Sequence, residues 1–332
     1  MHKNLIEQVL KTVRNYRMLK PGDKVMAAVS GGPDSVFLLE ALVHLKNKFG
    51  VKKLIVCNLD HGLRGKESQE DSLFVKDLTE KLGLEFIHKT VDLKKAAKGD
   101  LSTEEIARAA RYQFFREAAS SAGVNVIATG HTLDDQAETI LMRIVKGAAL
   151  KGIVGISPLR EDGDMMIVRP LIELEKANIV DYLNEKGMIY RIDSTNLKPV
   201  YFRNVVRSEI IPFLERYNPK LKRVLFNLAE HLREDFEFIS DQKAEVSGRI
   251  LSSGKNSAEI KLKDIAVQPR TIQKEILRDA LERSGGEVKK LSFRHWKEME
   301  SLIRYKQKGS SVDLPGSIRV TRTGTSITFH RL

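Results

Sequence analysis

The sequence has one cysteine in 332 residues, which excludes an intramolecular disulfide and a CxxC zinc or iron–sulfur site within the chain. Cys57 lies in an apolar run over residues 54–59, so we expect a buried structural thiol. No apolar run is long enough to cross a bilayer. The N-terminus continues into an amphipathic helix pattern and does not resemble a signal peptide. These absences predict a cytoplasmic protein with no membrane partner.

Two common nucleotide-binding patterns are also absent, because neither GxxxxGK[ST] nor GxGxxG occurs. The charge is not balanced: the chain has 56 lysines and arginines but 44 aspartates and glutamates, for a net charge of +12. An excess of this size favours a polyanionic partner such as RNA or DNA, although a solvated basic surface is the alternative. The length suits two or three domains.

Residues 1–215 alternate apolar runs with helical patterns, which is typical of a mostly parallel α/β sheet. The predicted strands are residues 24–29, 54–59, 85–91 and 124–128. The predicted helices of this part are residues 35–49, 67–82, 102–122, 132–146 and 174–187. This order predicts a doubly wound domain that binds ligands at the carboxyl ends of its strands.

The remainder of the chain changes character. Residues 216–245 predict a charged helical connector, and residues 246–332 predict a small α+β domain. The elements expected there are a strand over 257–262, helices over 269–284 and 293–305, and a hairpin over 311–329 that turns at Thr323-Gly324-Thr325. Trp296 shares a helical face with Met299 and Leu302, so we interpret it as a core residue and not as a base-stacking platform.

The first predicted strand runs directly into a small-residue loop and a helix, with the sequence Ser30, Gly31, Gly32, Pro33, Asp34, Ser35. Small residues let backbone N–H groups approach an anion, and the helix N-terminus adds partial positive charge. Pro33 suits the first helical turn. Because Asp34 would repel an anion, we expect a bridging Mg²⁺ on it. A glycine-rich turn without a ligand is the alternative.

A second motif follows the strand that ends near Gly130 and His131. The next helix opens with three acids at spacings that place carboxylates on neighbouring surface: Asp134, Asp135 and Glu138. They repel one another, so we expect a cation there, either Mg²⁺ or an ammonium group. Compensation of the helix dipole is the alternative. Two such motifs at strand ends of one sheet favour a functional site.

These stretches carry a family resemblance. Residues 30–35 match the SGGxDS signature of PP-loop ATP pyrophosphatases, which attack the α-phosphate of ATP and leave an adenylate. Together with residues 60–65, 130–139, 193–196 and 203–207, they make the chain similar to the tRNA(Ile)-lysidine synthetases. The match is close over about residues 20–215 and weaker over the tail. The resemblance implies a PP-loop, adenine nucleotide alpha hydrolase-like fold.

The resemblance implies a reaction in two steps. ATP activates C2 of the wobble cytidine in an isoleucine tRNA with a CAU anticodon, and pyrophosphate leaves. The side-chain amine of L-lysine then attacks C2, AMP leaves, and lysidine results. A lysine ammonium has a pKa of about 10.4 in water, so a base must remove a proton before attack. Asp135 is our candidate for that base.

The resemblance also implies roles for single residues. ATP contacts are expected at Ser30, Gly31, Gly32, Pro33, Asp34, Ser35, His61, Arg64 and Gly130. The candidate catalytic residues are Asp34, Arg111, His131, Asp135 and Glu138, with Mg²⁺ on Asp34. Lysine or tRNA binding is expected at Asp135, Glu138, Arg203 and Arg207, the two arginines through phosphates. A solvated helix position for Arg111 and a structural hydrogen bond for His131 are alternatives.

The basic tail is expected to hold tRNA through phosphates, with salt-sensitive affinity. Its cations are Lys289, Lys290, Arg294, Arg304, Lys306, Lys308, Arg319, Arg322 and Arg331. A solvated charged face is the alternative. PP-loop thiolation enzymes need cysteines that this chain lacks, and an ATP-sensing module would not need the carboxylate cluster. The resemblance further implies that the chain can form a homodimer.

Overall fold

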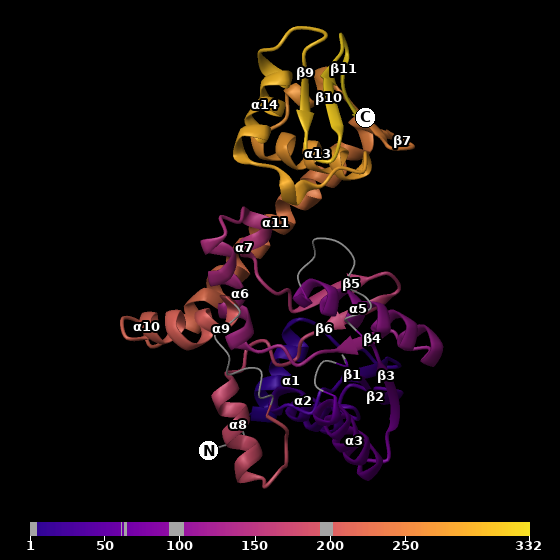
Figure 1. The fold of residues 1–332 in the computed structure, drawn as a ribbon, viewed down its shortest axis with the longest axis vertical. Helices are drawn as coiled ribbons and strands as arrows, with labels where there is room; N and C mark the ends of the chain where they lie inside the picture. The colour runs from indigo at the N-terminus through magenta and orange to yellow at the C-terminus, as the bar shows by residue number, and fades with distance from the viewer. Residues whose placement is uncertain (1–4, 61, 63–64, 93–102, 193–201) are drawn as a thin grey trace. The chain divides into compact units, whose positions relative to one another are not determined.

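The computed structural model describes residues 5–60, 62, 65–92, 103–192 and 202–332. The chain divides into two compact units, Met1–Glu230 and His231–Leu332 (Figure 1). The boundary lies inside the long helix α11 (Leu221–Ile250). The division into three parts, with a separate connector over residues 216–245, stays a prediction.

The first unit contains a six-stranded sheet in the order β3-β2-β1-β4-β6-β5. Its bounds are β1 (Lys24–Ala28), β2 (Lys53–Asp60), β3 (Glu85–Thr90), β4 (Val126–Ala128), β5 (Leu159–Asp162) and β6 (Met165–Val168). All neighbours pair in parallel except β5 and β6, which are antiparallel. The predicted doubly wound, mostly parallel sheet is confirmed.

Helices cover both faces of this sheet (Figure 1). The longer ones are α1 (Leu5–Asn15), α2 (Pro33–Leu45), α3 (Lys66–Lys81), α5 (Thr103–Ala122), α6 (Leu133–Val145) and α8 (Lys176–Glu185). One core joins α1, α2 and α8 to the sheet, and the other joins α5 to it. Burial on two faces explains why β1 and β2 read as continuous apolar runs. Cys57 on β2 is buried, as predicted, and burial raises the pKa of its thiol.

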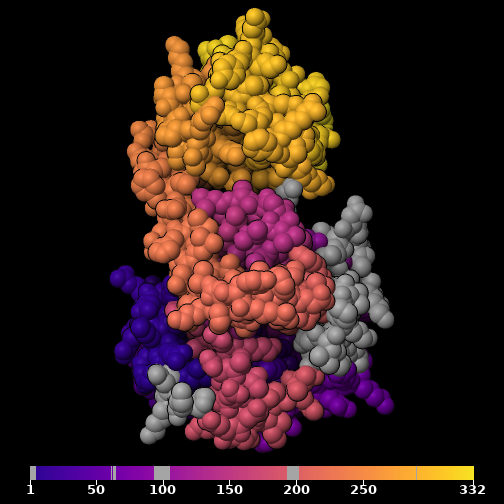
Figure 2. Space-filling model, turned by 90° about the vertical axis from the view of Figure 1, so that its left-hand side faces the viewer, coloured from indigo at the N-terminus to yellow at the C-terminus, as the bar shows by residue number. Residues whose placement is uncertain are grey.

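A series of short helices follows α8: α9 (Phe202–Val205), a π-helix (Val206–Ile210) and α10 (Ile211–Glu215), after which α11 begins. Val206, Ile211 and Leu225 from this series pack against Ala137 and Ile140 of α6. With α7 (Leu150–Ile153) and α8, the series forms much of the face of the first unit seen in Figure 2. This packing brings residues after 200 next to α6.

The second unit is built on an antiparallel five-stranded sheet in the order β7-β8-β11-β10-β9. Its strands are β7 (Leu251–Gly254), β8 (Ser257–Lys261), β9 (Ser311–Leu314), β10 (Ile318–Arg322) and β11 (Ser326–Arg331). Its helices are α12 (Leu262–Ala266), α13 (Arg270–Arg283) and α14 (Phe293–Arg304). The predicted α+β character is confirmed.

Three details of the sequence interpretation need correction. The expected hairpin over 311–329 is a three-stranded meander, although its second turn does lie at residues 323–325. The strands β5, β6 and β7 were not predicted, because each has only four residues and borders glycine-containing turns. Trp296 is half-buried: it packs against the core, and Arg278 Cζ lies 5.4 Å from its ring centroid.

Among the residues that the structure describes, no helix is long and apolar enough to span a membrane.

Candidate active site

The loop between β1 and α2 has the shape of an anion cradle. Gly31 has φ +90°, a conformation that L side chains rarely adopt, and its carbonyl accepts a hydrogen bond from Arg191 N at 2.9 Å. Gly32 is the N-cap of α2 and Pro33 occupies its first turn, as the sequence predicts. The Ser35 hydroxyl donates to Gly32 O at 2.9 Å and accepts from Ser30 N at 3.1 Å. Ser35 therefore holds the loop, whereas Ser30 is exposed.

Asp34 stands at the start of α2 with one oxygen engaged and one unengaged. Its Oδ2 lies 3.3 Å from Lys176 Nζ, whereas its Oδ1 is buried and has no hydrogen-bond partner among the described residues. Burial raises the pKa of Asp34 to about 6, opposed by Lys176 and reinforced by the nearby charge of Asp135. A buried carboxylate oxygen without a partner fits a cation ligand.

The Mg²⁺ expectation for Asp34 is compatible with the rest of the site. In the described part of the chain, no cluster of three or more His, Cys, Asp or Glu side chains is arranged to hold a metal ion. Mg²⁺ in phosphoryl sites is commonly bound by one or two carboxylates together with substrate phosphates and water. A single carboxylate beside an anion cradle is therefore the donor set expected of a nucleotide-borne Mg²⁺.

The second motif packs directly on this loop. A Cβ added to Gly130 would lie 3.2 Å from both C and O of Asp34, so the two backbones are in contact. Gly130 follows β4, the neighbour of β1 in the sheet. The absence of a side chain at Gly130 thus lets the start of α2 and the start of α6 lie side by side. The sequence predicted this meeting of the motifs but not the contact.

His131 is the next residue, and it is held neutral. Burial lowers the pKa of its imidazole well below its ordinary value. Asp135 opposes this shift, whereas the charges of Arg169, Arg111 and Arg203 reinforce it. Thr129 Oγ1 lies 2.9 Å from His131 Nδ1 and fixes the ring. A neutral imidazole is suited to hydrogen bonding with a phosphate or a base edge rather than to charge neutralisation.

The carboxylates at the start of α6 are paired with two arginines. Glu138 is 1% exposed and accepts from Arg203 Nε at 2.7 Å and from Arg207 Nε at 2.5 Å. Asp135 Oδ1 accepts from Arg203 Nη2 at 2.8 Å. Burial alone would raise the pKa of Asp135, but its interaction with His131, the charge of Arg203 and hydrogen bonds from Thr132 outweigh burial and lower the pKa. The structure thus brings all four predicted residues together, with the arginines on the carboxylates.

The Asp135 side chain also takes part in capping the N-terminus of α6. Thr132 is the N-cap of α6, and a capping box links its side chain and backbone to Asp135. Asp134 points elsewhere: it accepts from Lys176 N at 2.8 Å and lies 2.9 Å from Lys222 Nζ of α11. Asp134, one of the three acids of the predicted cluster, therefore connects α6 to α8 and α11.

Lys176 is the site residue that the sequence interpretation missed. It is the first residue of α8, and its ammonium reaches Asp34 although 142 positions separate them in the chain. A lysine in an amphipathic helix pattern carries no signal of such a contact, because only the packing of α8 beside α2 creates it.

Of the remaining predicted residues, Arg111 lies on α5, is exposed, and is near enough for its charge to lower the pKa of His131. His61 and Arg64 lie outside the described residues.

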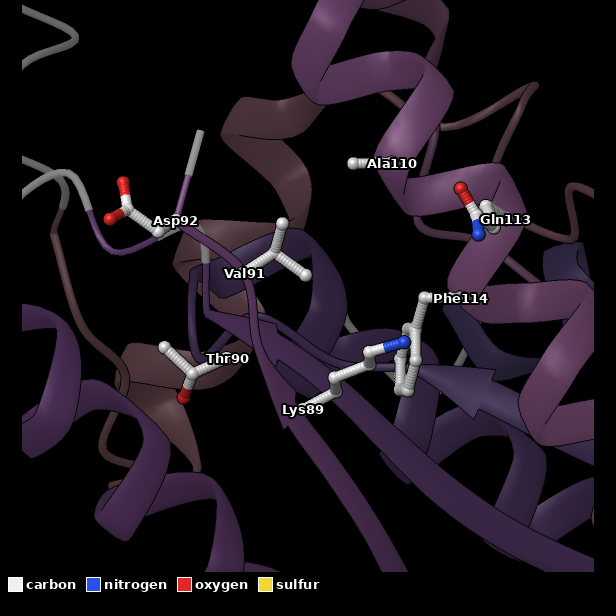
Figure 3. Close-up of a pocket in the computed structure, with 7 residues that line it drawn as sticks. All are labelled: Lys89, Thr90, Val91, Asp92, Ala110, Gln113 and Phe114. Atoms are coloured by element: carbon white, nitrogen blue, oxygen red, sulfur yellow. The ribbon is translucent and has the colours of Figure 1, made fainter. Parts of the chain in front are cut away.

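A hollow of about 480 Å³ opens between the end of β3 and α5 (Figure 3). None of the predicted site residues lines it; it is bounded by Lys89, Thr90, Val91, Asp92, Ala110, Gln113 and Phe114.

Three features define a nucleotide-binding PP-loop domain: the cradle after the first strand, the mostly parallel sheet, and Asp34, whose buried Oδ1 has no partner among the described residues. A family model described as PP-loop domain, ATP_bind_3, matches residues 1–214. The sheet region also resembles the U34-tRNA thiolase NcsA from Methanococcus maripaludis, with a TM-score of 0.59 and 20% identity, over 70% of this chain and 78% of that one. At this identity the likeness shows the fold alone.

Sequence comparison narrows the class, and the chain belongs to the tRNA(Ile)-lysidine synthase family. It is 34% identical over 327 residues to the tRNA(Ile)-lysidine synthase of Clostridioides difficile, covering 97% of this chain and 70% of the relative. The enzyme of Geobacter sulfurreducens is also 34% identical, over 332 residues, with coverage of 98% and 70%. The membership and the PP-loop domain make the chain an ATP-using ligase.

Proposed function

We propose that this chain uses ATP to adenylate the oxygen on C2 of the wobble cytidine in an isoleucine tRNA with a CAU anticodon, and then joins L-lysine to C2 as that oxygen leaves with AMP. Pyrophosphate leaves in the first step and AMP in the second. The contact between Gly130 and the backbone of Asp34 carries this proposal, because it places an anion cradle beside a carboxylate cluster. The family membership supports the same reaction.

In this mechanism the loop from Ser30 to Ser35 binds the ATP phosphates, and Asp34, whose Oδ1 has no hydrogen-bond partner among the described residues, would hold Mg²⁺. Mg²⁺ supplies charge neutralisation at the phosphates. The neutral His131 donates or accepts a hydrogen bond next to the reacting groups. Arg111 adds positive charge on the α5 side of the same space.

For lysine binding, the exposed fraction of each carboxylate supports the assignment of roles. Asp135 is 19% exposed and is the accessible carboxylate of the pair, so we assign it contact with the ammonium and removal of its proton. Glu138 is 1% exposed and is engaged by Arg203 and Arg207, so we assign it the positioning of those arginines. Their exposed parts would contact phosphates of ATP or RNA. Direct contact of Glu138 with lysine stays a prediction, as do a cytoplasmic location and a homodimer.

The second unit would add RNA contacts, but only some of its cations are available. Arg319 forms a two-pronged pair with Asp313, Arg294 pairs with Glu298, and Arg322 donates to carbonyls at the end of α14. A second group is exposed and lies together in sequence around Tyr305, which is itself 77% exposed: Arg304, Lys306 and Lys308. We assign the tRNA contact of this unit to that group. The side chain of Lys289 lies outside the described residues.

The direct test is incubation with ATP, Mg²⁺, labelled lysine and a tRNA that carries a CAU anticodon. Label should enter the isoleucine tRNA, and a methionine tRNA with the same anticodon should be refused. Asp34→Ala should abolish ATP-dependent pyrophosphate release, because it removes the buried oxygen proposed to bind Mg²⁺. Normal pyrophosphate release by this variant would refute the assigned metal site.

A further inference from the structure

Three arginines of the first unit surround one tyrosine. Tyr112 of α5 is 8% exposed. Arg108 Cζ lies 5.0 Å from the centroid of its ring, and Arg160 Cζ of β5 lies 4.6 Å from it. Arg169, which follows β6, lies near enough for Tyr112 to raise the pKa of its guanidinium. The ring faces attract guanidinium groups, but one tyrosine does not offset the repulsion among three cations.

The neighbouring positive charges lower the pKa values of two arginines, Arg169 and Arg143. Burial lowers the pKa of Arg169, and after the favourable effect of Tyr112 the charges of Arg160 and Arg108 lower it further. Burial and the charge of Arg108 also lower the pKa of Arg143 on α6. Among the described residues, the carboxylate paired with this group is Asp162, which lies 3.9 Å from Arg160 Nη2 and is shared with Arg116. Arg160 therefore shares its carboxylate with Arg116, while the positive charges of Arg108 and Arg160 act on Arg169.

The cluster also has unused hydrogen-bond donors. Arg160 Nε and Arg169 Nε are both buried and have no hydrogen-bond partner among the described residues. Unpaired buried donors cost free energy, and the cost is larger for charged groups. Arg160 keeps 41% of its side chain exposed, and Arg108 is exposed, so a ligand can reach both from solvent. Planar guanidinium groups with unused N–H donors match the oxygens of a phosphate.

The position of the cluster identifies which phosphate it fits. The PP-loop follows β1, His131 follows β4, and Arg169 follows β6, in the order β1-β4-β6 across the sheet. Two strand spacings separate the ends of β1 and β6, about 10 Å. The charge of Arg169 still acts on His131. The cluster thus lies on the side of His131 away from the cradle proposed for the phosphates of ATP.

We propose that Arg108 and Arg160, with the buried charge of Arg169 behind them, bind a backbone phosphate of the RNA substrate beside the nucleotide that is modified. This inference rests on the proposed function and adds a subsite that none of the motif residues supplies. Tyr112 holds the guanidinium groups in place, and Asp162 limits their number of free donors. The bound phosphate would supply the missing negative charge of the cluster.

The test compares RNA binding by the intact chain and its variants across a series of salt concentrations. The probe is a labelled anticodon stem-loop with a CAU anticodon. Arg108→Gln and Arg160→Gln alter exposed side chains, whereas Arg169 is avoided because it is 3% exposed and donates to Ser157 O. Lys76→Gln is the matched control, since it removes one surface charge from α3, where Lys76 pairs with Glu80. ATP affinity is measured in parallel.

We expect each arginine variant to bind the RNA about tenfold more weakly, and the slope of log affinity against log salt to fall by about 0.7, the value for one single-strand phosphate contact. Lys76→Gln and ATP affinity should remain at the wild-type level. Wild-type slope and affinity in both arginine variants would overturn the inference alone. A loss of ATP affinity in place of RNA affinity would also overturn it. A wild-type chain that does not bind the stem-loop would overturn the proposed function as well.

Discussion

Glu138 offers the sharpest test of how the carboxylates at the start of α6 are used. Its side chain is 1% exposed, and it accepts hydrogen bonds from Arg203 Nε at 2.7 Å and from Arg207 Nε at 2.5 Å. Glu138→Gln keeps the shape of the side chain and one oxygen acceptor but removes the charge. Both arginines then lose their main counter-charge, and the amide presents N–H groups to guanidinium donors.

The magnitude follows from the geometry. Breaking a buried ion pair on one side costs about 3–5 kcal/mol, and a hydrogen bond to a charged group contributes about 1.5–3 kcal/mol. Arg203 and Arg207 are 30% and 36% exposed, so water solvates part of the charge left behind. The amide oxygen also preserves one acceptor. We therefore expect Glu138→Gln to lower the free energy of unfolding of the first unit by about 2–4 kcal/mol.

Urea denaturation of the intact chain measures this change, with the transition of the first unit followed at pH 7.5. Glu80→Gln is the matched control, because Glu80 is 63% exposed and lies 3.7 Å from Lys76 Nζ. An exposed pair of this kind contributes about 0–1 kcal/mol. Equal stability of the two variants would refute the structural role of Glu138. A raised KM for lysine with unchanged stability would instead support the direct lysine contact that the sequence predicts.

Three further predictions concern the cradle and the tail. Asp34→Asn should stabilise the metal-free chain at pH 7.5 by about 3 kcal/mol, because a pKa of about 6 means that burial destabilises the ionised carboxylate. The difference in stability should vanish below about pH 4, where Asp34 is protonated in both the folded and the unfolded chain. Urea titrations at the two pH values measure it. Gly130→Ala should weaken ATP binding at least tenfold, because the new Cβ would lie 3.2 Å from Asp34 C and O. The control is Gly248→Ala, whose new Cβ meets nothing within 4 Å and should leave the ATP affinity measured by calorimetry unchanged. The salt dependence of tRNA binding should become shallower when glutamine replaces Arg304, Lys306 and Lys308, and unaltered affinity would contradict the assigned contact.

Much of the first unit follows from local patterns. The four predicted strands correspond to β1–β4. Apolar runs are typical of strands buried on two faces, which holds for β1, β2 and β4, whereas β3 is an edge strand without a buried residue. The sequence also predicted the phosphate cradle, since small residues between a strand and a helix favour a tight loop whose backbone N–H groups can approach an anion. The φ of +90° at Gly31 and the Pro33 start of α2 agree with that interpretation.

Ion pairs between residues far apart in the chain could not be predicted from the sequence in the same way. The sequence shows acids near 135 and arginines near 205, but both the free-carboxylate interpretation and the paired one fit that pattern. The packing of α9–α11 against α6 decides between them and places Arg203 and Arg207 on Glu138. The contact of Lys176 with Asp34 has the same origin in the packing of α8.

The sequence by itself determined the fold class, the position of the phosphate cradle and the acidic character of the opposing helix, because each depends on residues close together in the chain. The tertiary structure decided which charges are neutralised and which remain available. Among the described residues, Glu138 pairs with two arginines, Asp34 Oδ1 has no hydrogen-bond partner, and Arg160 beside Tyr112 shares Asp162 with Arg116. Charge balance at a site depends on distances between elements, and only the packing of the helices on the sheet sets those distances.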